Sequence, residues 1–137
     1  MKTEFLDLDA LVRAFADEWT RPNPSGLPRE LLADPILVLG PEGTTTVPRD
    51  AFLAAVAARS HAVEDVPAAQ TILTEVRVTG LGDRMVLATL SWSFGHAGGT
   101  AGLVSDFLFE FAEPGRLRCV AYLPRTNILD HLPADAS

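Results

Sequence analysis

Residues 85–111 decide the fold, and they read MVLATLSWSF, GHAGGTAG and LVSDFLFEF. In the first and third runs, large apolar residues alternate with other residues, and this period of two predicts strands with one buried face. The glycine-rich run between them is typical of a turn that joins antiparallel strands. The stretch therefore predicts a long hairpin with one strongly aromatic face. That face consists of Val86, Ala88, Leu90, Trp92, Phe94, Leu103, Ser105, Phe107, Phe109 and Phe111.

Three helices are predicted before this hairpin. Residues 7–20 carry apolar side chains at helical spacing, which gives one stripe that can pack on a sheet. Residues 27–33 form a short second helix, with Pro28 in its first turn. Residues 47–61 are rich in alanine and strongly favour a third helix, with Thr46 as its predicted N-cap.

The predicted strands comprise a short hairpin before the third helix and four long strands after it, all separated by glycine or proline turns. Three N-terminal helices packed on a curved antiparallel sheet make an α+β fold, with a cavity where the twisted sheet and the first helix diverge. We expect one domain over 1–137, with an ordered core at about 6–132 and a last turn at 127–132. The predicted strands are 36–39, 44–47, 70–79, 84–95, 102–112 and 116–124.

Composition excludes several classes of protein. The chain has 137 residues, a net charge of −7 and no cluster of Lys and Arg, so we expect no nucleic-acid partner and no binding to an anionic membrane. Its only cysteine, Cys119, lies in an apolar run and is predicted to be a buried hydrophobic residue. No apolar segment approaches the ~20 residues of a membrane span, and acidic residues stand where a signal peptide would be basic. The expected compartment is the cytoplasm.

Three segments resemble the nuclear transport factor 2-like superfamily, which includes ketosteroid isomerase, SnoaL-like cyclases and many uncharacterised bacterial proteins. The segments are ILVLGPEGTTTVPRDAFL at 36–53, LTEVRV at 73–78 and FEFAEPGRLRCVAYL at 109–123. The resemblance implies the cone-shaped, cystatin-like fold of that superfamily. It does not imply one function, because the same fold hosts isomerases, dehydratases, cyclases and proteins that only bind.

The resemblance also gives positions for three catalytic groups of ketosteroid isomerase, and this chain lacks all three. Phe15 stands where that enzyme has a tyrosine on its first helix, and Gly40–Pro41 replaces its Asp–Pro base. Phe107 matches its second acid, while Asp106 is one residue away and would point to the opposite face of the strand. Proton transfer beside an enolate needs a base and a donor at these sites, so we expect no isomerase activity.

Other polar residues offer weaker candidates for chemistry. His61, His96 and His131 are not at metal-ligand spacing, and we expect His61 to complement a helix dipole and His96 to be exposed. Asp34 is predicted to bind backbone amides, and Glu42 to be exposed in a turn, although either could act as a base. We expect no metal and no cofactor.

Two further polar residues, Arg125 and Asn127, follow the last predicted strand near the mouth of the cavity. Either could meet a carboxylate or carbonyl of a ligand, but surface positions are the simpler interpretation.

An aromatic cavity is the main functional hypothesis from the sequence. Aromatic residues with two hydroxyl groups among them fall on the inward faces of the first helix and the sheet, although an ordinary core would use them equally well. The hypothesis is a protein that binds a small, mostly apolar ligand. Two alternatives remain. One is an enzyme with non-standard residues that uses Asp34, Glu42, His61 or Tyr122, and the other is a structural or protein-interaction dimer with a collapsed cavity. The predicted ligand-binding residues are Phe15, Trp19, Trp92, Ser105, Phe107 and Tyr122.

The opposite face of the predicted hairpin is half apolar. Met85, Leu87, Val104 and Leu108 lie there among serine and threonine residues, on the side away from the helices. An apolar sheet face without a helix over it is a common association surface, so we expect a homodimer through it.

Overall fold

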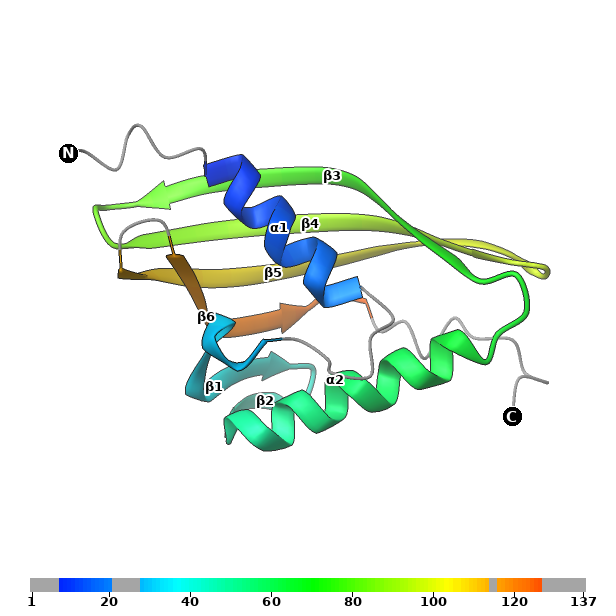
Figure 1. The fold of residues 1–137 in the computed structure, drawn as a ribbon, viewed down its shortest axis with the longest axis horizontal. Coiled ribbons are helices and arrows are strands. Elements are labelled where there is room, and N and C mark those ends of the chain that lie inside the picture. The colour runs from blue at the N-terminus through cyan, green and yellow to red at the C-terminus, as the bar shows by residue number, and fades with distance from the viewer. Residues whose placement is uncertain (1–7, 21–27, 114–115, 127–137) are drawn as a thin grey trace.

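A computed structural model of the chain describes residues 8–20, 28–113 and 116–126. It contains two α-helices, one 3-10 turn and one six-stranded sheet (Figure 1). The predicted last turn at 127–132 lies outside the described residues. The elements are α1 (Leu8–Thr20), η2 (Arg29–Leu31), β1 (Leu32–Gly40), β2 (Gly43–Val47), α2 (Arg49–Glu64), β3 (Gln70–Leu81), β4 (Met85–His96), β5 (Gly99–Glu113) and β6 (Arg116–Pro124).

The sheet has the strand order β2-β1-β6-β5-β4-β3. The four long strands pair antiparallel in sequence order, as predicted. The prediction of a wholly antiparallel sheet was wrong, because β1 pairs with β6 in parallel, with Val38 opposite Tyr122. The sheet is therefore mixed, and this parallel pairing joins the short β1–β2 hairpin to the rest.

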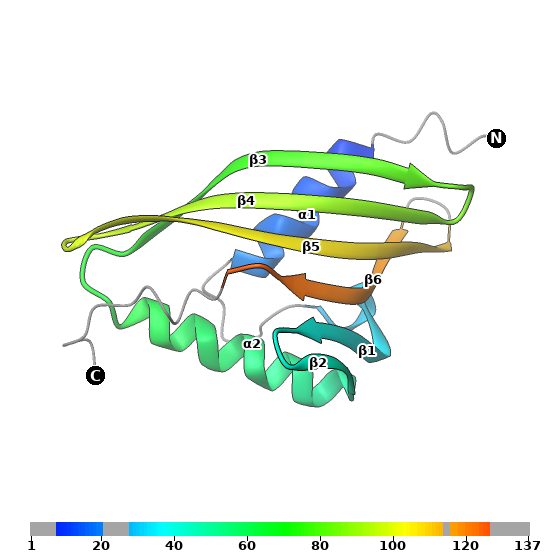
Figure 2. The same ribbon diagram turned by 180° about the vertical axis from the view of Figure 1, so that it is seen from behind.

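Helix α1 covers one face of the long strands, and the reverse view shows β3, β4 and β5 without a helix over them (Figures 1 and 2). The apolar stripe of α1 faces the sheet as predicted, with Val12, Phe15 and Trp19 buried. Helix α2 runs beside β1 at the other edge and buries Phe52 and Val56.

The β4–β5 hairpin has the predicted inward face. Trp92 pairs with Leu103, and Ala88 pairs with Phe107, so the inward residues of both strands lie on one face. The inward residues of β4 are all at most 5% exposed. At the turn, Gly99 has a φ of 142°, which a residue with a side chain rarely adopts, and the ring of His96 accepts a hydrogen bond from the Gly98 N–H. His96 is thus half-buried at the turn, and the prediction that it is simply exposed was wrong.

The predicted helix at 27–33 is a single 3-10 turn, so the prediction of three N-terminal helices was wrong. Leu32 already has the extended dihedrals of a strand, φ −124° and ψ 141°, and it pairs with Cys119. Leu32 is fully buried, and we attribute the strand conformation to this burial, because packing in the core can override a weak local helix preference.

Helix α2 begins later than predicted and is capped from a different place. Pro48 is its N-cap, and no side chain of the N-cap binds the first turn, so the prediction of a Thr46 cap was wrong. The Asp34 carboxylate, on β1, instead accepts a hydrogen bond of 3.0 Å from the Arg49 N–H. This bond confirms that Asp34 binds a backbone amide, and it fixes the start of α2 to β1.

The core is an aromatic cluster between α1 and the sheet. The Phe107 ring lies 5.2 Å from the rings of both Phe15 and Tyr122 and 4.9 Å from that of Trp19, at angles typical of aromatic packing. Cys119 is fully buried in the same core, as predicted.

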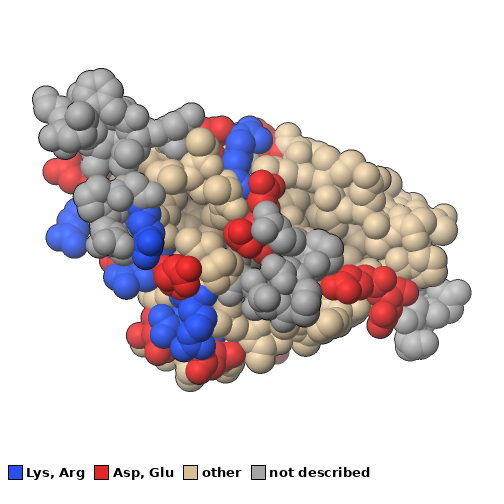
Figure 3. All heavy atoms as spheres, viewed as in Figure 1, with Lys and Arg blue, Asp and Glu red and all other residues tan. Residues whose placement is uncertain are grey.

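Charged side chains on the face seen in Figure 3 form no continuous basic patch. Arginine side chains there are interrupted by aspartate and glutamate, and five described ion pairs link residues of opposite charge. Among the described residues, no helix has the length and apolarity that a membrane span requires.

Candidate functional site

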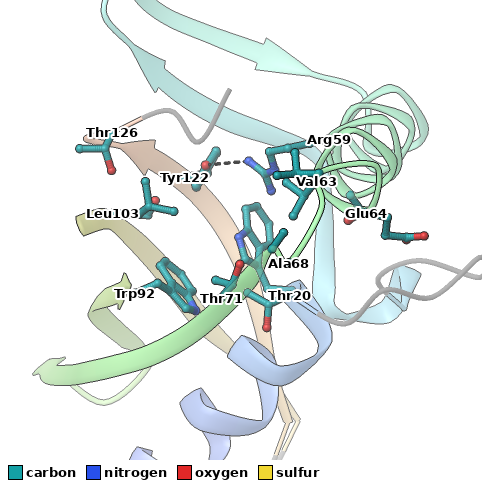
Figure 4. A pocket seen from close by; sticks show the side chains of 15 residues that line it. Thr20, Arg59, Val63, Glu64, Ala68, Thr71, Trp92, Leu103, Tyr122 and Thr126 are labelled. Carbon is teal, nitrogen blue, oxygen red and sulfur yellow. Dashed lines mark hydrogen bonds between the residues drawn. The ribbon is translucent and has the colours of Figure 1, made fainter. Parts of the chain in front are cut away.

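A hollow of about 490 Å³ lies where the end of α1, the last turns of α2 and the middle of the sheet meet (Figure 4). This volume falls within the roughly 300–1,000 Å³ of typical small-molecule sites. Its walls come from both α-helices and from strands β3 to β6. The lining residues are Trp19, Thr20, Arg59, Ser60, Val63, Glu64, Val66, Ala68, Ala69, Thr71, Trp92, Leu103, Ser105, Tyr122 and Thr126.

Four of the six residues predicted to bind a ligand line this hollow, namely Trp19, Trp92, Ser105 and Tyr122. They come from α1, β4, β5 and β6, so strand register and helix periodicity bring together residues far apart in sequence. Phe15 and Phe107 lie outside the lining and pack in the core, at 3% and 0% exposure. That any of these residues binds a ligand stays a prediction.

Arg59 on α2 is a lining residue that the sequence interpretation missed. Its guanidinium carbon lies 4.6 Å from the centre of the Trp19 ring, and its Nη1 donates a 3.2 Å hydrogen bond to the Tyr122 hydroxyl (Figure 4). These two contacts hold the guanidinium over the aromatic wall, where a cation interacts favourably with the ring. The hollow therefore offers a cation to a negatively charged group, which the six predicted binding residues do not.

The sequence does contain a signal for Arg59. Phe52 and Val56 define the buried stripe of α2, and the same helical spacing continues to positions 59 and 63. Position 63 is valine and packs against the core, whereas position 59 is arginine. A cation within an apolar stripe is unusual and marks a place where the helix borders polar atoms or solvent.

Trp92 contributes a polar atom without a partner. Its Nε1 is buried and forms no hydrogen bond within the described part of the chain, although the residue is only 5% exposed. Indole N–H groups usually find an acceptor when they are buried, because an unpaired donor loses its hydration without compensation. Since this atom is itself buried, it lies behind the surface of the hollow and is not in reach of a ligand there.

Groups for acid–base chemistry are scarce around the hollow. Glu64 is its one carboxylate among the described lining residues, and Figure 4 shows that side chain directed away from Arg59 and the aromatic rings. No described histidine lines the hollow, and the described residues contain no group of three or more side chains suited to a metal ion.

The residues considered for non-standard catalysis are dispersed. Asp34 is exposed on β1, where it binds the first turn of α2. Glu42 is exposed in the turn between β1 and β2, as predicted. His61 is exposed in the last turn of α2, the position at which a cation complements the dipole. Asn127 and His131 lie outside the described residues.

Asp106 lies on the face of the sheet opposite the hollow. It pairs with Thr89 across the β4–β5 ladder, accepts a hydrogen bond from the Thr89 hydroxyl, and forms a 2.7 Å ion pair with Arg125. Its side chain is 8% exposed, so these partners compensate for lost hydration. Neither Asp106 nor Arg125 is a lining residue of the hollow.

Comparison with solved structures identifies this architecture. A nuclear transport factor 2-like protein of unknown function from Shewanella oneidensis superposes with a TM-score of 0.60 at 14% identity, over 86% of this chain and 95% of that one. An uncharacterised protein with a cystatin-like fold from Caulobacter vibrioides gives a TM-score of 0.63 at 15% identity, over 85% and 84% of the two chains. The chain has the nuclear transport factor 2-like fold.

This fold also occurs in a proposed ketosteroid isomerase from Shewanella frigidimarina, which superposes with a TM-score of 0.60 at 12% identity, over 84% of this chain and 91% of that one. No protein-family model and no curated protein matches the chain. Likeness at such low identity carries the nuclear transport factor 2-like fold and its topology, and function has to be argued from the site itself.

Proposed function

We propose that this protein binds a small, mostly apolar molecule in the hollow between α1, α2 and the sheet. The observation that carries the proposal is a hollow of about 490 Å³ that is lined by Trp19, Trp92 and Tyr122 and is not filled by them. An apolar body would lie against Trp19, Leu103 and Val63, and a hydrogen-bonding group of the ligand would face Ser105 or Tyr122.

The volume of the hollow supports this proposal over a purely structural role. A protein that used its aromatic residues only for packing would fill this space, because interiors are packed about as densely as organic crystals. Here two tryptophans and a tyrosine border the space and do not close it.

The scarcity of acid–base groups favours binding over catalysis. General acid–base catalysis requires a titratable side chain within hydrogen-bond reach of the reacting atom. Among the described lining residues, only Glu64 and Tyr122 accompany Arg59 as ionisable groups, and Glu64 is directed away from the rings. The absence of isomerase activity remains a prediction that rests on Phe15, Gly40 and Phe107.

Intrinsic fluorescence provides the test, because both tryptophans of the chain line the hollow. We would titrate the protein with neutral ring compounds, such as 2-naphthol and 2-naphthamide, and follow tryptophan emission. The expected result is a saturable change that fits one site. Ala69→Phe, which places a ring in the hollow, should weaken binding about tenfold or more, whereas Ala54→Phe on the exposed side of α2 should not. No saturable change with any compound, or equal effects of both variants, would contradict the proposal.

A further inference from the structure

Arg59 differs from most described arginines in how its charge is compensated. Ion pairs with carboxylates are formed by Arg13, Arg29, Arg77, Arg118 and Arg125. Arg59 contacts instead the face of Trp19 and the hydroxyl of Tyr122, both of which are neutral. In a chain with a net charge of −7, carboxylates are plentiful, and none of the described ones pairs with this guanidinium.

The geometry leaves donors available at this point of the hollow. A guanidinium has five N–H donors, and Arg59 uses one of them on Tyr122. Because the Tyr122 oxygen accepts that bond, its own O–H remains able to donate to another acceptor. Two donors from two different elements, α2 and β6, thus lie together at one end of an otherwise mostly apolar space.

We infer that the hollow selects a ring-containing carboxylate, with Arg59 and Tyr122 binding the carboxylate group and the aromatic wall binding the ring. This inference rests on the proposed function and names its ligand class. A carboxylate matches the planar fork of a guanidinium, and its single negative charge balances Arg59, the one cation among the described lining residues. A phosphate dianion would leave a second charge uncompensated in a partly apolar space.

The preorganisation of Arg59 favours this role. Stacking on Trp19 removes much of the rotamer freedom that a long side chain would otherwise lose on binding. Since the site is largely apolar, a charge-assisted hydrogen bond formed there is stronger than one formed in water. The protein should therefore bind a carboxylate much more tightly than a neutral ligand of the same shape.

The test compares 2-naphthoate with 2-naphthamide, which have the same ring and differ in charge. At neutral pH, the protein should bind the carboxylate about tenfold or more tightly than the amide, as measured by tryptophan fluorescence. Arg59→Met should remove this preference by weakening the carboxylate, while the dissociation constant for the amide changes by about twofold or less. Arg59→Lys should keep part of the preference, because the charge remains but the fork is lost.

Arg77→Met is the matched control. It makes the same change in net charge, but Arg77 lies on the edge strand β3, paired with Glu75 and outside the lining. The control should keep the preference for the carboxylate. Circular dichroism of each variant establishes that it is folded, and Arg59→Gln replaces Arg59→Met if the latter does not fold.

Three outcomes would overturn the inference. The first is equal binding of carboxylate and amide to the original protein. The second is a loss of the carboxylate preference in Arg77→Met as large as in Arg59→Met. The third is tighter binding of 2-naphthyl phosphate than of 2-naphthoate. If the amide binds while the carboxylate has no advantage, the assignment of Arg59 fails and the proposed function stands. If none of the ring compounds binds, the proposed function fails with it.

Discussion

Cys119 shows how a single residue reports on the core. Its side chain is fully buried, and burial raises the pKa of the thiol from 9.0 to about 12, although a hydrogen bond with the backbone of Ala121 lowers it in part. The thiol in the folded protein is therefore neutral across the ordinary pH range and a poor nucleophile.

This raised pKa predicts a loss of stability in alkali. The unfolded chain releases the thiol proton above pH 9.0, whereas the folded chain holds it until about pH 12. The contribution of Cys119 to the free energy of unfolding is thus complete below pH 9.0 and lost between pH 9.0 and about 12, at about 1.4 kcal/mol per pH unit. Urea unfolding at about pH 8 and about pH 10 measures this fall in the free energy of unfolding.

Cys119→Ala is the reference for this measurement, because it removes the titrating group at the same site. Between the two pH values, the original protein should lose about 1.4 kcal/mol more stability than the variant. An equal loss in both proteins would mean that the thiol ionises as readily in the folded state as in the unfolded one.

At the scale of elements, α2 depends on a contact from β1. Asp34→Ala removes the carboxylate that accepts the Arg49 N–H, and the first turn of α2 has no side-chain cap of its own. We expect the free energy of unfolding to fall by about 0.5–2 kcal/mol, the usual effect of losing a helix cap. Chemical denaturation measures it. Thr46→Ala, at the position where the sequence suggests a cap, should have little effect, and a larger loss there than in Asp34→Ala would contradict the assignment.

The same elements show what the sequence could predict. The period of two in residues 85–111 is sufficient to place every inward residue of β4, and the stripe of α1 is equally clear. The prediction of a helix at 27–33 was wrong because the strand conformation of Leu32 depends on its burial beside β6. No local sequence pattern contains that contact. The parallel pairing of β1 was missed for the same reason.

Lining residues of the hollow could be predicted only where they follow the periodicity of a helix or a strand. Trp19, Trp92, Ser105 and Tyr122 follow from inward faces, but the same argument included Phe15 and Phe107, which fill the core. Whether an inward residue borders a space depends on how far the helix lies from the strand, and periodicity does not encode this distance. Arg59 interrupts the apolar period of α2, so a stripe defined by apolar residues does not include it.

At the scale of the whole molecule, the uncovered sheet face raises the question of association. We propose that the chain forms a homodimer through this face, where Leu87 is 36% exposed and Met85, Val104 and Leu108 are half-buried. Light scattering at micromolar concentration should give the mass of a dimer. Leu87→Glu should shift the protein toward the monomer, because like charges would meet across a symmetric interface. A monomeric original protein would refute the proposal.

The two indole N–H signals in a ¹H–¹⁵N correlation spectrum report whether the hollow binds a ligand. The chain has two tryptophans, and both line the hollow, so each signal reports on one wall. On titration with 2-naphthoate, we predict that both signals shift with one common dissociation constant. Indole signals that stay in place at ligand saturation, or that move equally in Ala69→Phe, would contradict the account.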